Sequence, residues 1–124
     1  MLLRRIPDEP KRATHDAPQM SRRETPYGSV EVLHQGADLT AWRIEKDGEE
    51  IDPAMEVCDR EDALVVLHGT LRMELAGSPP VDVHVGEVFV IPAGVPFRGY
   101  RWPRNGEPCI FAAVAPAGAE FTPH

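Results

Sequence analysis

The sequence feature that most constrains the fold is a series of short runs in which apolar and polar residues alternate. In "LTAWRIE" the alternation places Trp42 and Ile44 on one face of a strand and charged residues on the other. In "TLRMELAG" the side chains of Leu71, Met73 and Leu75 share a face in the same way. Thirteen prolines and ten glycines, spread without a period, separate such runs, and no long window keeps the apolar spacing of a helix. These patterns predict an all-β protein.

The run "ALVVLHG" is apolar on both faces, which is typical of a strand in the middle of a sheet. Its second apolar face, with Val65 and Leu67, needs cover. Seven or eight strands of this length fit into about 90 residues. A closed or nearly closed barrel would pair the edges that an open sheet leaves exposed, so we predict a small barrel.

The chain divides into three segments of different composition. Residues 1–26 mix charge and proline with few large apolar groups, which predicts a flexible or arm-like segment. If this segment is ordered, we expect it to lie against another subunit or the outside of the barrel. Residues 27–118 are predicted to form a single barrel domain, because a chain of 124 residues suits one core. Residues 119–124 are predicted to be a C-terminal tail.

The formal net charge of −7 argues against nucleic acid and anionic membranes as partners, because both require clustered Lys and Arg. No apolar run is long enough for a signal peptide or a membrane span, so we expect a cytoplasmic location. Cys58 and Cys109 lie far apart and form no CxxC motif. We expect two buried or inert thiols rather than a disulfide.

Gly86, Pro92 and Gly94 form a Gly-x5-Pro-x-Gly pattern within "GEVFVIPAGVPFRGYR". A strand-glycine-strand pattern, "EDALVVLHGTLRMEL", precedes it and turns at Gly69. In these two features the chain resembles the cupin family over roughly residues 39–116. The resemblance implies a double-stranded β-helix, also called a cupin or jelly-roll barrel.

The resemblance also locates the positions that hold a metal ion in many cupins, usually three histidines and a glutamate. Counting back from Gly69, Asp62 stands at the glutamate position, and Glu56 and Cys58 stand at the first two histidine positions. Phe97 stands at the position of the last histidine. Because no imidazole is left in this set, we expect no metal cofactor.

An alternative is that Glu56, Cys58 and Asp62 hold a divalent metal, since zinc accepts cysteine and carboxylate ligands. Phe97 weighs against this alternative, because a phenyl ring has no lone pair to donate. The ring indicates an apolar pocket or, equally, a barrel filled by its own side chains.

Carboxylates that point into a dry barrel are costly or take up protons. A metal, a nearby cation or an open, water-filled mouth would each offset this cost. Arg101, at the position of an asparagine in the family motif, shares strand parity with Phe97. Its guanidinium is therefore placed to pair with Asp62 or to hold an anionic ligand, although a surface location is the other interpretation.

We therefore expect a small-molecule-binding protein of unassigned activity and unassigned catalytic residues. The candidate pocket residues are Trp42, Glu56, Cys58, Asp62, Phe97 and Arg101. The alternatives are a cupin enzyme of the dioxygenase or isomerase/epimerase type, using the metal set above or a carboxylate base, and a purely structural barrel. The resemblance also implies a homodimer that pairs through the outer sheet, and the second apolar face of "ALVVLHG" agrees with this.

Overall fold

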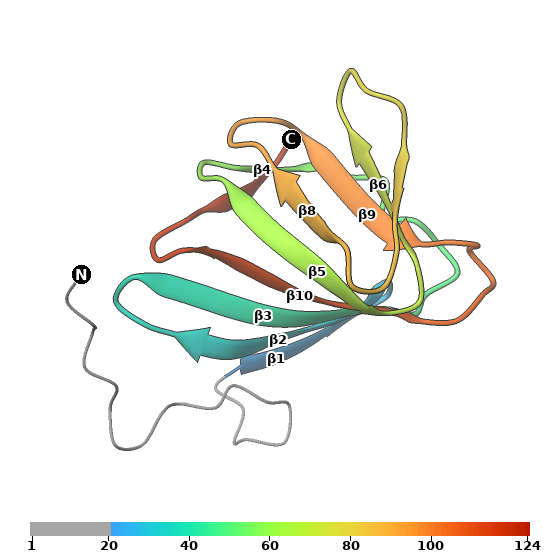
Figure 1. Ribbon diagram of the computed structural model, residues 1–124, viewed down its shortest axis with the longest axis horizontal. Coiled ribbons are helices and arrows are strands. Elements are labelled where there is room, and N and C mark those ends of the chain that lie inside the picture. Colours follow the sequence, from blue (N-terminus) through green and yellow to red (C-terminus); the bar gives the residue numbers. More distant parts are fainter. Residues whose placement is uncertain (1–20) are drawn as a thin grey trace.

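The computed structural model describes residues 21–124, which fold into two antiparallel sheets that face each other (Figure 1). The first sheet has six strands in the order β1-β2-β3-β10-β5-β8, and the second has five in the order β11-β4-β9-β6-β7. The strands of the first sheet are β1 (Ser21–Thr25), β2 (Gly28–Gln35), β3 (Leu39–Lys46), β5 (Asp62–His68), β8 (Val88–Ile91) and β10 (Cys109–Pro116). Those of the second are β4 (Glu56–Cys58), β6 (Leu71–Leu75), β7 (Val81–Val83), β9 (Phe97–Arg101) and β11 (Phe121–Pro123).

The predicted all-β barrel is confirmed, and the described residues contain more strands than the sequence indicated. Strand β1 lies in the segment expected to be an arm and pairs along its whole length with β2, from Ser21–Val32 to Thr25–Gly28. Strand β11 lies in the segment expected to be a tail and pairs with β4, from Phe121–Cys58 to Pro123–Glu56. The barrel therefore extends beyond residues 27–118 at both ends. Residues 1–20, the rest of the expected arm, lie outside the described residues.

Two glycines of the cupin-type pattern occupy turns that favour glycine. Gly86 and Gly94 have φ angles of 83° and 77°, a region that residues with a Cβ rarely adopt. The Gly86 amide donates to the Val66 carbonyl oxygen at 2.9 Å, and the Gly94 amide donates to the Cys58 carbonyl oxygen at 2.8 Å. These bonds tie the turns on either side of β8 to β5 and β4.

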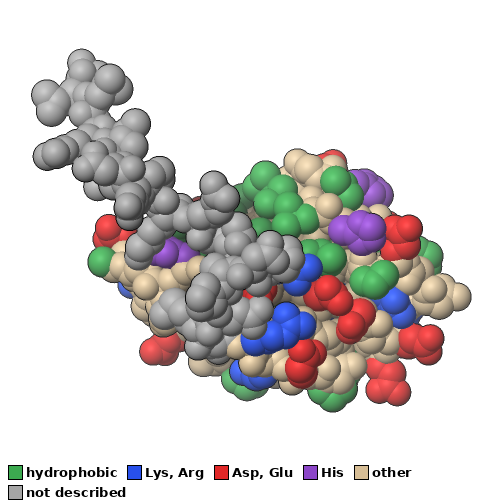
Figure 2. Space-filling view, turned by 90° about the horizontal axis from the view of Figure 1, so that it is seen from below, with side chains coloured by type: hydrophobic (Ala, Val, Ile, Leu, Met, Phe, Trp, Pro, Cys, Tyr) green, Lys and Arg blue, Asp and Glu red, His purple; other side chains and the backbone are tan. Residues whose placement is uncertain are grey.

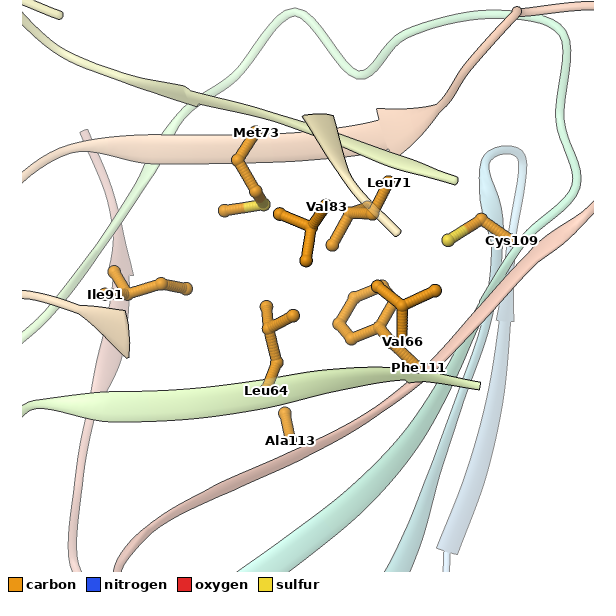
Figure 3. Close-up of a cluster of buried hydrophobic side chains, with 9 residues drawn as sticks. All are labelled: Leu64, Val66, Leu71, Met73, Val83, Ile91, Cys109, Phe111 and Ala113. Carbon is orange, nitrogen blue, oxygen red and sulfur yellow. The ribbon is translucent and has the colours of Figure 1, made fainter. Parts of the chain in front are cut away.

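The hydrophobic core lies between the two sheets, where the inward residues of β5 and β10 meet those of β6 (Figure 3). Alternation along β5 buries Leu64 and Val66, which are 3% and 1% exposed. The core residues are Leu64, Val66, Leu71, Met73, Val83, Ile91, Cys109, Phe111 and Ala113. Cys58 and Cys109 are both buried free thiols, as predicted, and burial raises the pKa of Cys109 to about 12.

The outer faces of the two sheets differ in character. On the second sheet, Arg72 donates two hydrogen bonds to Asp82 (2.7 and 3.0 Å), and Arg98 donates two to Glu74 (3.2 and 3.0 Å). On the first sheet, the outward positions of β5, β8 and β10 are aliphatic, and their exposed members are Leu67, Val88, Val90 and Val114. Figure 2, seen from below Figure 1, shows apolar side chains gathered in one part of the visible face and mixed positive and negative side chains in another.

The part of the chain that the structure describes contains no helix long and apolar enough to cross a membrane.

Candidate functional site

A cavity of about 450 Å³ opens between the two sheets beside the hydrophobic core. This volume is within the range of ordinary small-molecule sites. Its apolar lining comes from both sheets and includes Val30, Trp42, Ile44, Leu64, Met73, Ile91, Phe97, Phe111, Ala113 and Phe121. Its charged lining comprises Arg23, Glu45, Lys46, Asp52, Glu56, Asp62 and Arg98. The cavity thus combines an apolar wall with seven charged side chains.

Three aromatic side chains from three strands form one wall of the cavity. Trp42 of β3 meets Phe121 of β11 edge-to-face, with ring centroids 5.5 Å apart and an interplanar angle of 88°. Phe97 of β9 meets the same Phe121 at 6.4 Å and 77°. Trp42 and Phe97, two of the predicted pocket residues, both line the cavity. Phe121 was missed, because its strand has three residues and lay in the expected tail.

Asp62 is the deeply buried charged group of the cavity. It begins β5, pairs with Ile91 of β8, and shares the inward face of β5 with Leu64 and Val66. Its exposed fraction is 4%, and its Oδ1 atom has no hydrogen-bond partner among the described residues. Burial raises the pKa of Asp62 to about 6 from an ordinary value of 3.8. This carboxyl group therefore changes between its neutral and charged forms near pH 6.

Arg101 is buried, but it lies outside the cavity lining. Its exposed fraction is 8%, so the surface interpretation does not hold. Its Nη1 donates to the carbonyl oxygen of Gly106 at 2.8 Å, and no ion pair joins it to Asp62 in residues 21–124. The reason is its position along β9, because Arg101 stands four positions after Phe97, about 13 Å along a strand. Strand alternation correctly predicted that Arg101 lies on the inner face of β9. However, Arg101 pairs with Leu71 of β6, at the end of the barrel that core side chains fill.

Cys58 and Glu56 stand at opposite ends of the three-residue strand β4 and have different surroundings. Cys58 is fully buried, is not part of the cavity lining, and has its thiol pKa raised by burial. Glu56 is exposed, pairs with Phe97 across the sheet, and lines the cavity. Of the six predicted pocket residues, the structure brings four together at the cavity, namely Trp42, Glu56, Asp62 and Phe97.

The donor set does not fit the metal ion that cupins often carry. Within residues 21–124, no group of three His, Cys, Asp or Glu side chains is arranged to hold a metal. Glu56, Cys58 and Asp62 therefore do not converge as a ligand set in this part of the chain, and Phe97 supplies no lone pair.

Three cationic side chains line the cavity, namely Arg23, Lys46 and Arg98. Arg98 donates to Glu74 and to the carbonyl oxygens of Asp52 and Pro53, at 3.5 and 3.3 Å for the two carbonyls. Lys46 ends β3, and burial lowers the pKa of its amine, whereas Glu56 and Asp52 act in the opposite direction. Lys46 was not among the predicted pocket residues, because its position at a strand end reads as a turn.

Comparisons with known proteins bear on the fold. No protein-family model matches the chain, and no curated protein matches it either. An RmlC-like cupin family protein with a double-stranded β-helix fold from Methanocaldococcus jannaschii is similar in structure, with a TM-score of 0.64 and 16% identity. The match covers 84% of this chain and 93% of that chain.

Two further similar structures carry names of enzymes. A putative mannose-6-phosphate isomerase from Ralstonia eutropha JMP134 has a TM-score of 0.65 and 21% identity, over 89% of this chain and 99% of that one. A DMSP lyase from Ruegeria pomeroyi DSS-3 has a TM-score of 0.66 and 16% identity, over 79% of this chain. The match spans about half of the lyase, 51% of its chain. Architecture and structural likeness agree that this chain has the double-stranded β-helix fold of the cupins.

Proposed function

We propose that the protein binds a small organic molecule in the cavity between its two sheets. The observation that carries this proposal is a cavity of about 450 Å³ whose deep carboxyl group, Asp62, has no partner for its Oδ1 atom. A buried carboxyl group without a hydrogen bond costs free energy that a bound donor would recover. The aromatic wall adds apolar surface that a ligand would remove from water.

A cavity of this kind favours ligand binding over a purely structural barrel. A structural barrel of this size is filled by its own side chains, and here Trp42, Phe97 and Phe121 border open space instead. The site that we propose contains no metal, because the donors at Glu56, Cys58 and Asp62 do not converge.

The proposal is tested by a thermal-shift screen of small molecules of 10–20 heavy atoms, about the size that such a cavity encloses. Each hit is measured again on an Ala113→Leu variant, because Ala113 lines the cavity and a larger side chain there fills it. We expect hits that raise the melting temperature of the natural protein and not that of the folded variant. A screen without hits, or hits that bind both proteins equally, would refute ligand binding in this cavity.

A second candidate function is acid–base catalysis by Asp62, which its pKa of about 6 favours. A general acid or base works best when its pKa lies near the working pH. The names of the similar structures, a lyase and a putative isomerase, show that this fold accommodates enzymes. The test is proton exchange of a bound ligand with heavy water, which Asp62→Asn should abolish while the ligand still binds.

A further inference from the structure

Among the described residues, 21–124, Asp62 has no counter-charge. In residues 21–124 no Lys, Arg or His side chain comes within ion-pair distance of its carboxylate. Arg101, which the sequence placed to pair with Asp62, donates instead to the carbonyl oxygen of Gly106 at the packed end of the barrel. A carboxylate that is 4% exposed and unpaired is stabilised most strongly by a positive charge brought from outside.

The cavity also has an aromatic wall. The face of an aromatic ring carries partial negative charge and attracts cations within about 6 Å of its centroid. Trp42, Phe97 and Phe121 are arranged edge-to-face in pairs, so their ring planes are turned in different directions. Apolar parts of a ligand gain contact with the same rings.

None of the three positively charged side chains that line the cavity, Arg23, Lys46 and Arg98, forms an ion pair with Asp62 in residues 21–124. Arg98 is held by Glu74 and by two backbone carbonyl oxygens of the 47–55 loop. Lys46 lies at the last position of β3, near Glu56 and Asp52, whereas Asp62 lies at the first position of β5. In the first sheet, Val114 of β10 pairs with Ala63 of β5 on one side and with Ala41 of β3 on the other. The start of β5 therefore lies level with the start of β3, and Lys46, at the end of β3, lies far along the sheet from Asp62.

We propose that the ligand is an organic cation, a molecule with an ammonium group on an apolar body of cavity size. Its positive charge faces Asp62, and its apolar body lies against Trp42, Phe97 and Phe121. This inference rests on the proposed binding function and names the class of ligand.

The test compares three probes with the same phenyl-alkyl frame and different charge. The probes are (2-phenylethyl)trimethylammonium, 3-phenylpropan-1-ol and 3-phenylpropionate, titrated into the protein at pH 8 by calorimetry. A quaternary ammonium cannot lose its charge, so its binding reports the state of the protein alone. We expect the ammonium to bind at least tenfold more tightly than the alcohol, and the carboxylate to bind more weakly than both.

Three variants assign the selectivity to Asp62. Asp62→Asn should remove the preference for the ammonium over the alcohol, and Asp62→Glu should keep it. Glu61→Gln removes the same charge from the adjacent exposed residue, which does not line the cavity, and should leave the preference unchanged. Circular dichroism and melting curves establish that each variant is folded.

The outcomes separate this inference from the proposed function. An alcohol that binds as tightly as the ammonium, or a preference that survives Asp62→Asn, would overturn the organic cation and leave small-molecule binding intact. Failure of all three probes to bind would also overturn the inference, and the wider screen would then decide whether the cavity binds any molecule.

Discussion

The two halves of the barrel interior are built from the same alternating strands but perform different tasks. In one half, Val66, Leu71 and Val83 are 3% exposed or less and fill the space between the sheets. In the other half, Trp42 and Phe97 are only partly buried and border a cavity that holds a charged carboxyl group. Strand β5 passes from one half to the other, with Asp62 at the cavity and Val66 in the core.

The comparison teaches that stability and binding are divided between the two ends of single strands. Packed aliphatic side chains at one end supply the burial that holds the sheets together. At the other end, an unpaired carboxyl group lowers stability and keeps a polar group available for a ligand. Substitutions in the two halves should therefore have effects of opposite sign or of very different size.

The largest effect is expected for Leu71→Ala in the packed half. Leu71 is fully buried, and removing its side chain loses apolar burial and leaves a void, so we expect a loss of about 2–5 kcal/mol in the free energy of unfolding. Urea denaturation followed by circular dichroism measures it. A loss below about 1 kcal/mol would show that this half is loosely packed and would remove the contrast.

A stabilising effect is expected for Asp62→Asn in the cavity half. Because the pKa of Asp62 is about 6 in the folded state and 3.8 ordinarily, the folded state binds more protons between these two values. The natural protein therefore loses stability as the pH rises from 3.8 to 6, by up to about 3 kcal/mol. Asparagine carries no charge, so the variant should be more stable at pH 8.

The control for this prediction is the same pair of proteins at pH 3.5. There Asp62 is protonated in the folded state, and the difference between the two free energies of unfolding should nearly vanish. A variant that is less stable at pH 8 would mean that the carboxylate is paired, and the cavity half would then be as well satisfied as the core.

Several features of the two halves of the barrel could be predicted from the sequence. Alternation along "LTAWRIE" and "TLRMELAG" predicted the inward faces, and the Gly-x5-Pro-x-Gly pattern predicted the turns at Gly86 and Gly94. The position of Asp62 on the inward face follows from the same alternation, since Leu64 shares its parity. These features are local, because each depends on the period of one strand or on the backbone of one turn.

Other parts of the site depend on contacts that are distant in the sequence. The alternation of side chains along β9 predicted that Arg101 lies on the inner face. It could not predict how far along the barrel Arg101 lies from Asp62, because that distance depends on the register between separate strands. The wall residue Phe121 comes from a three-residue strand whose partner, Cys58, is more than sixty residues away. A strand so short has no period of its own to detect.

A smaller loss of stability is expected for Phe97→Ala at the cavity wall. Phe97 is partly buried and already borders open space, so removing its ring enlarges a void instead of creating one in a packed region. We expect a loss of about 1–2 kcal/mol, below the range for a fully buried phenylalanine. Urea denaturation beside Leu71→Ala gives the comparison directly, and equal losses in the two variants would show that the two halves are packed alike.

The smallest effect on folding is expected for Val88→Lys on the outer face of the six-stranded sheet. Val88 is 67% exposed, so the change in the free energy of unfolding should stay within about 0.5 kcal/mol.

The same substitution bears on the predicted homodimer, because Val88, Val90 and Leu67 belong to one aliphatic face. If two copies pair through this face, a lysine there should convert the dimer to a monomer in light scattering. Val81→Lys, at a 46% exposed valine of the other sheet, is the matched control and should leave the dimer intact. A natural protein that is monomeric, or a Val88→Lys protein that is still dimeric, would contradict pairing through this face.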